Sequence, residues 1–399
     1  MNVIRQIKIF NAGREPERLA MKYQKMRSSS FGFLRATCHL FYDRLPKSGL
    51  FKSAPLTWVC GDLHLENFGS YKGNNRLAYF DLNDFDEAAL APASWEVVRI
   101  LTSLLVGAES LSIKPSEACA LCSAFLDSYA STLAVGKAYW IESETAQGVI
   151  RDLLVSLADR KRVDFLRTRT VLKNKKRSIL LDGKRALVVS EPQLKIVIDF
   201  MARFAKAQSQ PEFFKVLDVA RRIAGTGSLG VNRFAILVEG KGYPAGHYLL
   251  DLKQALPSSV APYLQPLQPK WRSDAHRIVE IQRRMQAVSV ALLQPVRFDD
   301  GNYVLRELQP LEDRVSLDQT HQTLDQLKLI VRNMGQMLAW AQLRSAGRQG
   351  SATADDLIAF GARKKWKNKL LTKAASCASQ VKKDALTFNA SYDAGDFDA

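Results

Sequence analysis

Two acidic segments near the start of the chain constrain its fold more than any other feature. Residues 58–67 read WVCGDLHLEN, and residues 79–87 read YFDLNDFDE. They present a carboxylate at Asp62, an amide at Asn67 and another carboxylate at Asp81. Phosphoryl-transfer enzymes of the kinase type use these groups in this order: one carboxylate orients the acceptor hydroxyl, while an amide and a second carboxylate hold magnesium on the nucleotide phosphates. The fold must therefore bring the two segments together.

The choice of metal-binding carboxylate in the second segment stays open. Asp81 is the first choice, because it ends an apolar run where a strand would present it towards the Asp62 loop. Asp84 is the second choice and requires the strand to end before it. If the strand continued, Asp84 and Asp86 would share a face and point away from Asp81. We expect His64 to hold the shape of the loop rather than to bind metal.

A glycine-rich segment, residues 225–230 (GTGSLG), matches the pattern G-x-G-x-x-G. Alone this signal is weak, because two unrelated phosphate sites use it and an ordinary tight turn remains open. A dinucleotide site needs a helix directly after the glycines, whereas residues 231–238 (VNRFAILV) resemble a strand. We therefore expect a hairpin tip that covers phosphates. The residues expected to contact the nucleotide are Gly225, Gly227, Ser228 and Gly230.

Two charged residues that follow the glycine-rich segment are placed to contribute to a phosphate site. Lys253 lies near the end of the next expected strand, where its side chain can reach back to the α- and β-phosphates. Glu280 lies on the following expected helix and is placed to pair with Lys253, as in kinases. An ordinary surface pair between Glu280 and Arg284, four positions on, is the alternative.

The hydrophobic pattern divides the chain into three parts. Residues 1–210 form a catalytic-loop and helical lobe, residues 211–312 form a β-rich nucleotide-binding lobe, and residues 313–399 form helices that pack back on the helical lobe. Apolar runs at 57–60 and 76–82 suggest a hairpin that carries the acidic motif on its connecting loop. Helical periodicity covers 13–48, 95–107, 116–134, 146–159, 192–206, 274–293 and 323–346.

Composition indicates a soluble globular protein. Apolar residues make up 47% of the 399 residues, and no apolar run approaches the roughly 18–20 residues of a membrane span. The N-terminus lacks an apolar signal core. Five cysteines form no disulfide framework, so we expect reduced thiols and a cytoplasmic location. The net charge of +17 favours a polyanion contact, although solvated basic faces are the commoner explanation.

Several motifs, taken in order, resemble the bacterial family called domain of unknown function 2252, over about residues 18–345. They are SSSFGFLRA (28–36), GDLHLENFG (61–69), FDLNDFDEA (80–88), AGTGSLGVNRF (224–234) and RIVEIQRRMQA (277–287). That family has no well-established activity to carry over.

A more distant resemblance connects the chain to aminoglycoside and choline kinases. GDLHLEN is similar to their H-G-D-x-H-x-x-N loop, and APASWEVVRI (91–100) is similar to the G-D-P-x-x-D-L-A segment after their metal-binding aspartate. The chain departs from these kinases at Cys60, where they usually have histidine. It departs again at Ser94-Trp95-Glu96, where the spacing of the later aspartate differs.

The order of the expected kinase parts is rotated. The catalytic loop comes first, the glycine loop, lysine and helix glutamate follow, and the helix at 323–346 resembles the one that precedes the catalytic loop in kinase-like phosphotransferases. A circular permutation explains this order. We therefore expect an α+β, two-lobed, protein-kinase-like fold that is circularly permuted, with a small antiparallel β lobe and a larger helical lobe.

The expected function is transfer of phosphate from ATP, with Mg²⁺, to a hydroxyl of a small molecule, because no activation segment for a protein substrate is recognisable. A nucleotide-binding pseudokinase or regulatory module is the first alternative. A metal-dependent phosphohydrolase built on the aspartates is the second.

Overall fold

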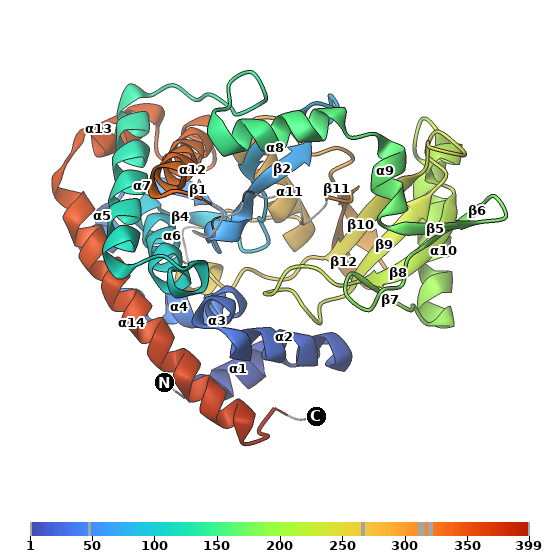
Figure 1. Ribbon diagram of the computed structural model, residues 1–399, viewed down its shortest axis with the longest axis horizontal. Helices are drawn as coiled ribbons and strands as arrows, with labels where there is room; N and C mark the ends of the chain where they lie inside the picture. The colour runs from blue at the N-terminus through green and yellow to red at the C-terminus, as the bar shows by residue number, and fades with distance from the viewer. Residues whose placement is uncertain are drawn as a thin grey trace.

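The protein has a strand-rich part and a larger helical part (Figure 1). Residues from both parts line a cavity. The structure, a computed structural model, describes residues 2–46, 49–264, 268–309, 315, 317 and 322–397. Its strands pair in antiparallel sheets and its helices are mostly segregated from them, so the expected α+β class is confirmed.

An antiparallel sheet forms the strand-rich part, and its six strands within the described residues are ordered β11-β12-β10-β9-β8-β7. Every residue of the central strand β9 is buried, because α10 packs an apolar face over one side of the sheet. Both β7 and α10 precede residue 211, so the sheet draws on elements before the expected lobe boundary; the boundary expected at 312–313 lies outside the described residues. The bounds are β7 (Ala186–Leu187), α10 (Glu191–Lys206), β8 (Val216–Arg222), β9 (Arg233–Val238), β10 (Tyr248–Gln254), β11 (Gln294–Phe298) and β12 (Gly301–Glu307).

Long helices build the other part around the buried α6. Gly335 lets α12 approach α7 closely, since a Cβ there would lie 2.6 Å from the carbonyl oxygen of Phe125. The C-terminal α14 runs along the outside of this part, in red in Figure 1, and packs on α6. The bounds are α6 (Ala93–Gly107), α7 (Pro115–Val135), α12 (Leu324–Arg344), α13 (Ala354–Ala362) and α14 (Lys365–Asp393).

Of the described helices, α7 is the one long and apolar enough to cross a membrane by length and composition. Its most apolar window is 44% buried inside the protein, and the helix packs against α12 and α13. A core helix passes the same test of length and composition, so this finding does not assign a membrane span.

Two short strand pairs hold the acidic segments. β1 (Leu56–Val59) pairs with β4 (Ala89–Pro92), and β2 (Phe68–Lys72) pairs with β3 (Ala78–Leu82). The expected hairpin between 57–60 and 76–82 is therefore wrong, because residues 73–77 form a short turn after which β3 pairs with β2 instead. Because the last residue of β1 lies opposite the first residue of β4, the loop after β1 and the segment before β4 emerge at the same edge.

Short helices at the N-terminus lie beside both parts (Figure 1, blue). The helical stretch expected at 13–48 is interrupted, because Ser29 is extended (φ −165°, ψ 153°) and caps the next helix by accepting the amide of Gly32. The bounds are α1 (Val3–Asn11), α2 (Pro16–Ser28), α3 (Ser30–Ala36), α4 (Cys38–Asp43) and α5 (Leu50–Ser53).

The remaining elements connect these parts. Ser273 caps α11 by accepting the amide of His276, but α11 ends at Met285 rather than 293 because Gln286 is extended. The hairpin β5–β6 lies in a region expected to be mainly helical. The bounds are η1 (Leu65–Asn67), η2 (Glu109–Leu111), α8 (Gly148–Asp159), α9 (Arg162–Arg167), β5 (Thr170–Lys173), β6 (Lys176–Ile179), η3 (Pro211–Phe214), η4 (Ala261–Tyr263) and α11 (Asp274–Met285).

Candidate active site

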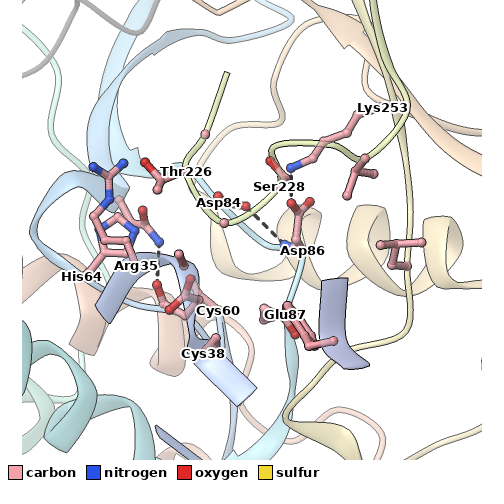
Figure 2. A pocket seen from close by; sticks show the side chains of 18 of the residues that line it. Arg35, Cys38, Cys60, His64, Asp84, Asp86, Glu87, Thr226, Ser228 and Lys253 are labelled. Atoms are coloured by element: carbon pink, nitrogen blue, oxygen red, sulfur yellow. Dashed lines mark hydrogen bonds and ion pairs between the residues drawn. The ribbon is translucent and has the colours of Figure 1, made fainter. Parts of the chain in front are cut away.

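The cavity between the two parts has a volume of about 840 Å³, counted with the solvent at its open side. Segments far apart in the sequence line it: the N-terminal helices, the loop after β1, the segment between β3 and β4, the loop between β8 and β9, and the end of β10 (Figure 2). Its charged lining residues are Arg14, Arg35, Asp62, Asp84, Asp86, Glu87 and Lys253.

The loop after β1 is fixed through its backbone. Gly61 has φ +84°, and a Cβ there would lie 2.1 Å from the carbonyl oxygen of Glu87, so only glycine fits. Oε1 of Glu96, on the first turn of α6, accepts the amides of Cys60 at 2.6 Å and Gly61 at 3.2 Å. The Tyr42 hydroxyl donates to the Gly61 carbonyl at 2.5 Å. Glu96 thus anchors the loop from the segment whose spacing departs from that of aminoglycoside and choline kinases.

Asp62 follows this anchor and is held by an ion pair. The fully buried Arg99 of α6 donates to Asp62 Oδ1 from Nη2 at 2.5 Å and from Nε at 3.1 Å. Burial raises the pKa of Asp62, and Arg99 opposes that rise. The second oxygen, Oδ2, lies on the side of Gly227, since a Cβ built on that glycine would be 4.0 Å from it. One oxygen of the carboxylate is therefore fixed and the other faces the β8–β9 loop.

Asn67 is tied to the same loop. Its Nδ2 donates to the Asp62 carbonyl at 2.7 Å, which leaves the amide oxygen as the group that can bind a cation. His64 Nδ1 accepts the amide of Glu66 at 3.2 Å, and its ring meets the edge of Phe31. His64 thus stabilises the turn that carries Asn67, in line with the expected role.

Asp81, the first choice for the metal, is not among the cavity-lining residues. Its Oδ2 accepts from Arg344 Nη2 at 3.1 Å and from the amide of Ala287 at 3.2 Å. Asp81 therefore does not line the cavity that Asn67 lines. The sequence pattern could not show that Arg344, from the far end of α12, donates to this carboxylate.

Asp84, the second choice, lines the cavity. β3 ends at Leu82, so the strand does end before this residue, as the second choice requires. Burial opposes ionisation of Asp84, but Lys253, Arg306 and the amide of Asp86 outweigh burial and lower its pKa. A carboxylate with a lowered pKa is suited to bind a cation at neutral pH.

Lys253 projects into the cavity but pairs with a residue other than the expected one. Its Nζ forms an ion pair with Asp86, as Figure 2 shows. Glu280 instead pairs with Arg283 at 3.3 Å on the surface of α11 and does not line the cavity. The expected Lys253–Glu280 pair is therefore wrong, because the segment between β3 and β4 places a carboxylate closer to Lys253 than α11 does.

The β8–β9 loop is a hairpin tip. Gly225, Gly227 and Ser228 line the cavity, and Figure 2 shows Ser228 beside the Lys253–Asp86 pair. No hydrogen bond among the described residues uses the amides of Thr226, Gly227 and Ser228. Gly230 does not line the cavity, and its carbonyl accepts the amide of Glu15 at 2.9 Å. The tip therefore presents free amides, whereas Gly230 contacts the N-terminal segment.

Several lining residues were not identified from the sequence. Arg14 comes from the turn between α1 and α2 and Arg35 from α3, and only Arg35 falls inside a recognised motif, SSSFGFLRA. Burial raises the pKa of Glu87 to about 7, and its Oε2 accepts the amide and hydroxyl of Ser259. Glu87 is the last residue of the second acidic segment, but the sequence pattern does not indicate a role for it.

The chain matches the sequence model of a family described as "Uncharacterized protein conserved in bacteria (DUF2252)" over residues 14–391. This match covers most of the chain and agrees with the resemblance seen in the motifs. No curated protein and no solved structure matches the chain.

Proposed function

We propose that this protein, which belongs to the uncharacterized bacterial family DUF2252, is an ATP- and magnesium-dependent phosphotransferase that acts on a hydroxyl of a small molecule. One observation carries the proposal: Asp62, Asn67 and Asp84 line the same cavity as a glycine-rich hairpin tip and Lys253. These are the groups that phosphoryl transfer uses for positioning and charge stabilisation.

The phosphates would lie against the β8–β9 loop. Thr226, Gly227 and Ser228 offer free amides, which are donors of the kind that binds phosphate oxygens. Lys253 supplies a positive charge beside them, and Asp86 keeps this side chain aimed into the cavity until a phosphate competes for it. This arrangement gives Asp86 the holding role that the sequence assigned to Glu280.

Magnesium would be held by Asn67 and Asp84. Among the described residues no group of three or more His, Cys, Asp or Glu side chains is arranged to hold a metal ion. Mg²⁺ commonly binds through one or two carboxylates together with substrate phosphates and waters, so an amide oxygen and one ionised carboxylate fit a metal that arrives with the nucleotide. The bound ion would neutralise charge on the transferring phosphate.

Asp62 would orient the acceptor. Its free Oδ2 faces the phosphate side of the cavity, and Arg99 opposes the rise of its pKa. As the acceptor oxygen bonds to the γ-phosphorus and the bond to the ADP oxygen breaks, the hydroxyl proton passes to the Asp62 carboxylate. Rotation of Asp62 is prevented because Arg99 holds Oδ1.

The kinase-like, permuted fold is also a proposal, and a contact at the end of α12 supports it. The amide of Ala352 donates to the Leu56 carbonyl at 2.8 Å, and Trp58 Nε1 donates to the Arg348 carbonyl at 3.1 Å. The segment after α12 thus meets the strand that leads into the Asp62 loop without being continuous with it. An unpermuted kinase-like chain would run directly through this contact.

The test compares wild type with Asp62→Asn and Asp325→Asn, an exposed control on α12. Calorimetry with ATP and Mg²⁺ measures binding, and release or transfer of labelled γ-phosphate measures turnover. We expect all three proteins to bind ATP, and Asp62→Asn alone to lose turnover by roughly 100-fold or more, the size of a general-base effect.

Other outcomes point to the alternatives. Absence of ATP binding would contradict the proposal. Binding without turnover that depends on Asp62 indicates a nucleotide-binding pseudokinase. Turnover that survives in Lys253→Ala indicates a metal-dependent phosphohydrolase, since that chemistry needs neither the lysine nor the glycine-rich loop.

A further inference from the structure

Two basic side chains from the N-terminal segment donate to carbonyls of the glycine-rich loop, and one of them, Arg14, also lines the cavity. Arg14 Nη1 donates to the carbonyls of Gly227 at 2.7 Å and Leu229 at 3.0 Å. Lys22 Nζ, on α2, donates to the same Gly227 carbonyl at 3.0 Å and to Asn11 Oδ1 at 2.8 Å. The Gly227 carbonyl therefore accepts from two basic side chains.

This arrangement decides which groups of the loop can meet an anion. In a planar trans peptide the carbonyl and the following amide point in opposite directions. Since cations occupy the carbonyls of Gly227 and Leu229, the amides of Ser228 and Gly230 point away from them. Ser228 lines the cavity, so its amide is available to a phosphate. A charged donor on a carbonyl also strengthens the peptide dipole that the phosphate would meet.

Burial indicates that Lys22 has a specific role. The residue is fully buried, and burial together with the nearby Arg14 lowers its pKa well below the ordinary value. Burying a lysine costs free energy unless its donors are satisfied, and here Asn11, Gly227 and the face of Phe10 surround it. A methionine would fill the same space at lower cost, so folding alone does not explain a lysine.

The N-terminal segment is fixed to both parts of the protein. Towards the sheet, the Glu15 amide donates to Gly230, and Arg221 of β8 pairs with Glu15 at 3.2 Å and Glu17 at 2.8 Å. Towards the helices, α1 packs on α14 and α3 packs on α6. Cations on this segment therefore hold the loop relative to Asp62, which lies on the helical side.

We propose that Arg14 and Lys22 are positioning residues that hold the glycine-rich loop with its amides towards the phosphate site. The proposal rests on the proposed phosphotransferase function for the identity of the anion, and on the contacts above for the holding of the loop. The identity of the anion and the holding of the loop can be disproved separately, and the experiment has one measurement for each.

The first measurement needs no nucleotide. Inside the loop, the amides of Leu229 and Val231 donate to the carbonyls of Thr226 and Ser228, so their hydrogen exchange reports opening of the loop. We expect exchange at these amides to be at least about 10-fold faster in Lys22→Met and in Arg14→Gln, equivalent to about 1.4 kcal/mol. Arg14→Lys should recover part of the protection. Arg27→Gln, on the exposed side of α2 where Arg27 pairs with Asp393, is the matched control and should exchange like wild type.

The second measurement compares ATP with adenosine, which lacks phosphates. In Lys22→Met the dissociation constant for ATP with Mg²⁺ should rise about 10-fold or more while that for adenosine stays constant. A general loss of structure would weaken the binding of both ATP and adenosine. The thermal unfolding temperature of Lys22→Met should be no lower than that of the Arg27→Gln control.

Exchange as slow as in wild type in both variants would overturn the positioning role, whatever happens to ATP. Faster exchange with unchanged ATP affinity would overturn the link to phosphate. If wild type itself binds no ATP, the proposed function fails and the phosphate role fails with it, while the exchange result still decides whether the loop is held.

Discussion

Asp81 and Asp84 carry the same side chain three positions apart, and their partners distinguish them. In the interior, the Asp81 carboxylate accepts hydrogen bonds from Arg344 and from the Ala287 amide. Asp84 lines the cavity, where Lys253 and Arg306 help to lower its pKa against the effect of burial. A buried carboxylate that already pairs with an arginine cannot be removed without cost, whereas one at a cavity wall can bind a cation.

Replacement of Asp84 by asparagine should therefore affect mainly turnover, and replacement of Asp81 by asparagine should affect mainly stability. Asp84→Asn should lower magnesium-dependent turnover by about 100-fold or more, equivalent to about 2.7 kcal/mol, with little loss of stability. Asp81→Asn should destabilise the protein by about 3 kcal/mol, because it leaves Arg344 without its carboxylate. Turnover during magnesium titration and urea unfolding measure the two effects. A magnesium requirement altered in Asp81→Asn but not in Asp84→Asn would reverse the assignment.

At the scale of elements, the position of the Asp62 loop depends on α6. The β1 strand alone does not determine where its following loop points. Glu96 in the first turn of α6 accepts the loop amides, and Arg99 one turn later binds Asp62. The two residues are three positions apart and therefore lie on the same face of the helix. One helix face thus both supports the loop and orients its carboxylate.

The burial of Glu96 against the loop amides should make the free energy of unfolding depend on pH. Burial raises the pKa of Glu96 to about 8. Between pH 4.5 and 8 the folded protein keeps a proton that the unfolded chain releases, so the free energy of unfolding falls as pH rises, by at most about 1.4 kcal/mol per pH unit. Glu96→Gln cannot ionise and should remove this fall.

Urea unfolding of wild type, Glu96→Gln and the exposed control Glu109→Gln across pH 5–8 tests the expectation. The stability difference between wild type and Glu96→Gln should change steadily with pH, and that between wild type and Glu109→Gln should not. Parallel curves for all three proteins would show that Glu96 does not titrate in this window.

At the scale of the whole molecule, contacts between distant segments join the chain ends. Lys8 of α1 lies over the ring of Phe397 at 5.3 Å, and Arg27 of α2 pairs with Asp393 of α14. The two ends of the described chain therefore pack together (Figure 1). Between α10 and η3, residues 207–210 form a largely exposed connection. New termini are tolerated at such exposed positions when the old termini are close.

A chain that begins at Pro211, runs through Ala399 and a Gly/Ser linker of about ten residues to Met1, and ends at Gln210 should fold and keep its activity. Such a linker has an average reach of roughly 17 Å. This order places the strand-rich part first, as in an unpermuted kinase-like chain. Circular dichroism, urea unfolding and ATP turnover within about threefold of wild type are the expected results.

A second permutant, opened between Thr226 and Gly227, is the control, and it should fold but lose ATP binding because the loop is cut. If the permutant opened at residue 211 unfolds, the covalent connection between α10 and η3 is required for the fold. That result would contradict the proposed permuted relation to kinase-like chains.

Much of the local structure was predictable because it depends on near neighbours. Helical periodicity located α6, α7, α8, α10 and α12 within a few residues of their observed bounds, and Gly225 and Gly230, both with positive φ, formed the expected hairpin tip. The failures were contacts between distant segments. The pairing of β3 with β2 rather than with β1 was one, and the pairing of Lys253 with Asp86 rather than with Glu280 was another.

The sequence by itself determined the α+β class, the family and the inventory of groups, since residue types and their periodicity carry that information directly. Only the tertiary structure decided which of those groups meet. In the folded chain Asp84 lines the cavity, Asp81 pairs with Arg344, and Arg14 and Lys22 donate to the Gly227 carbonyl of the glycine-rich loop. The physical reason is that burial and charge pairing depend on packing between segments far apart in the chain, which no local pattern records.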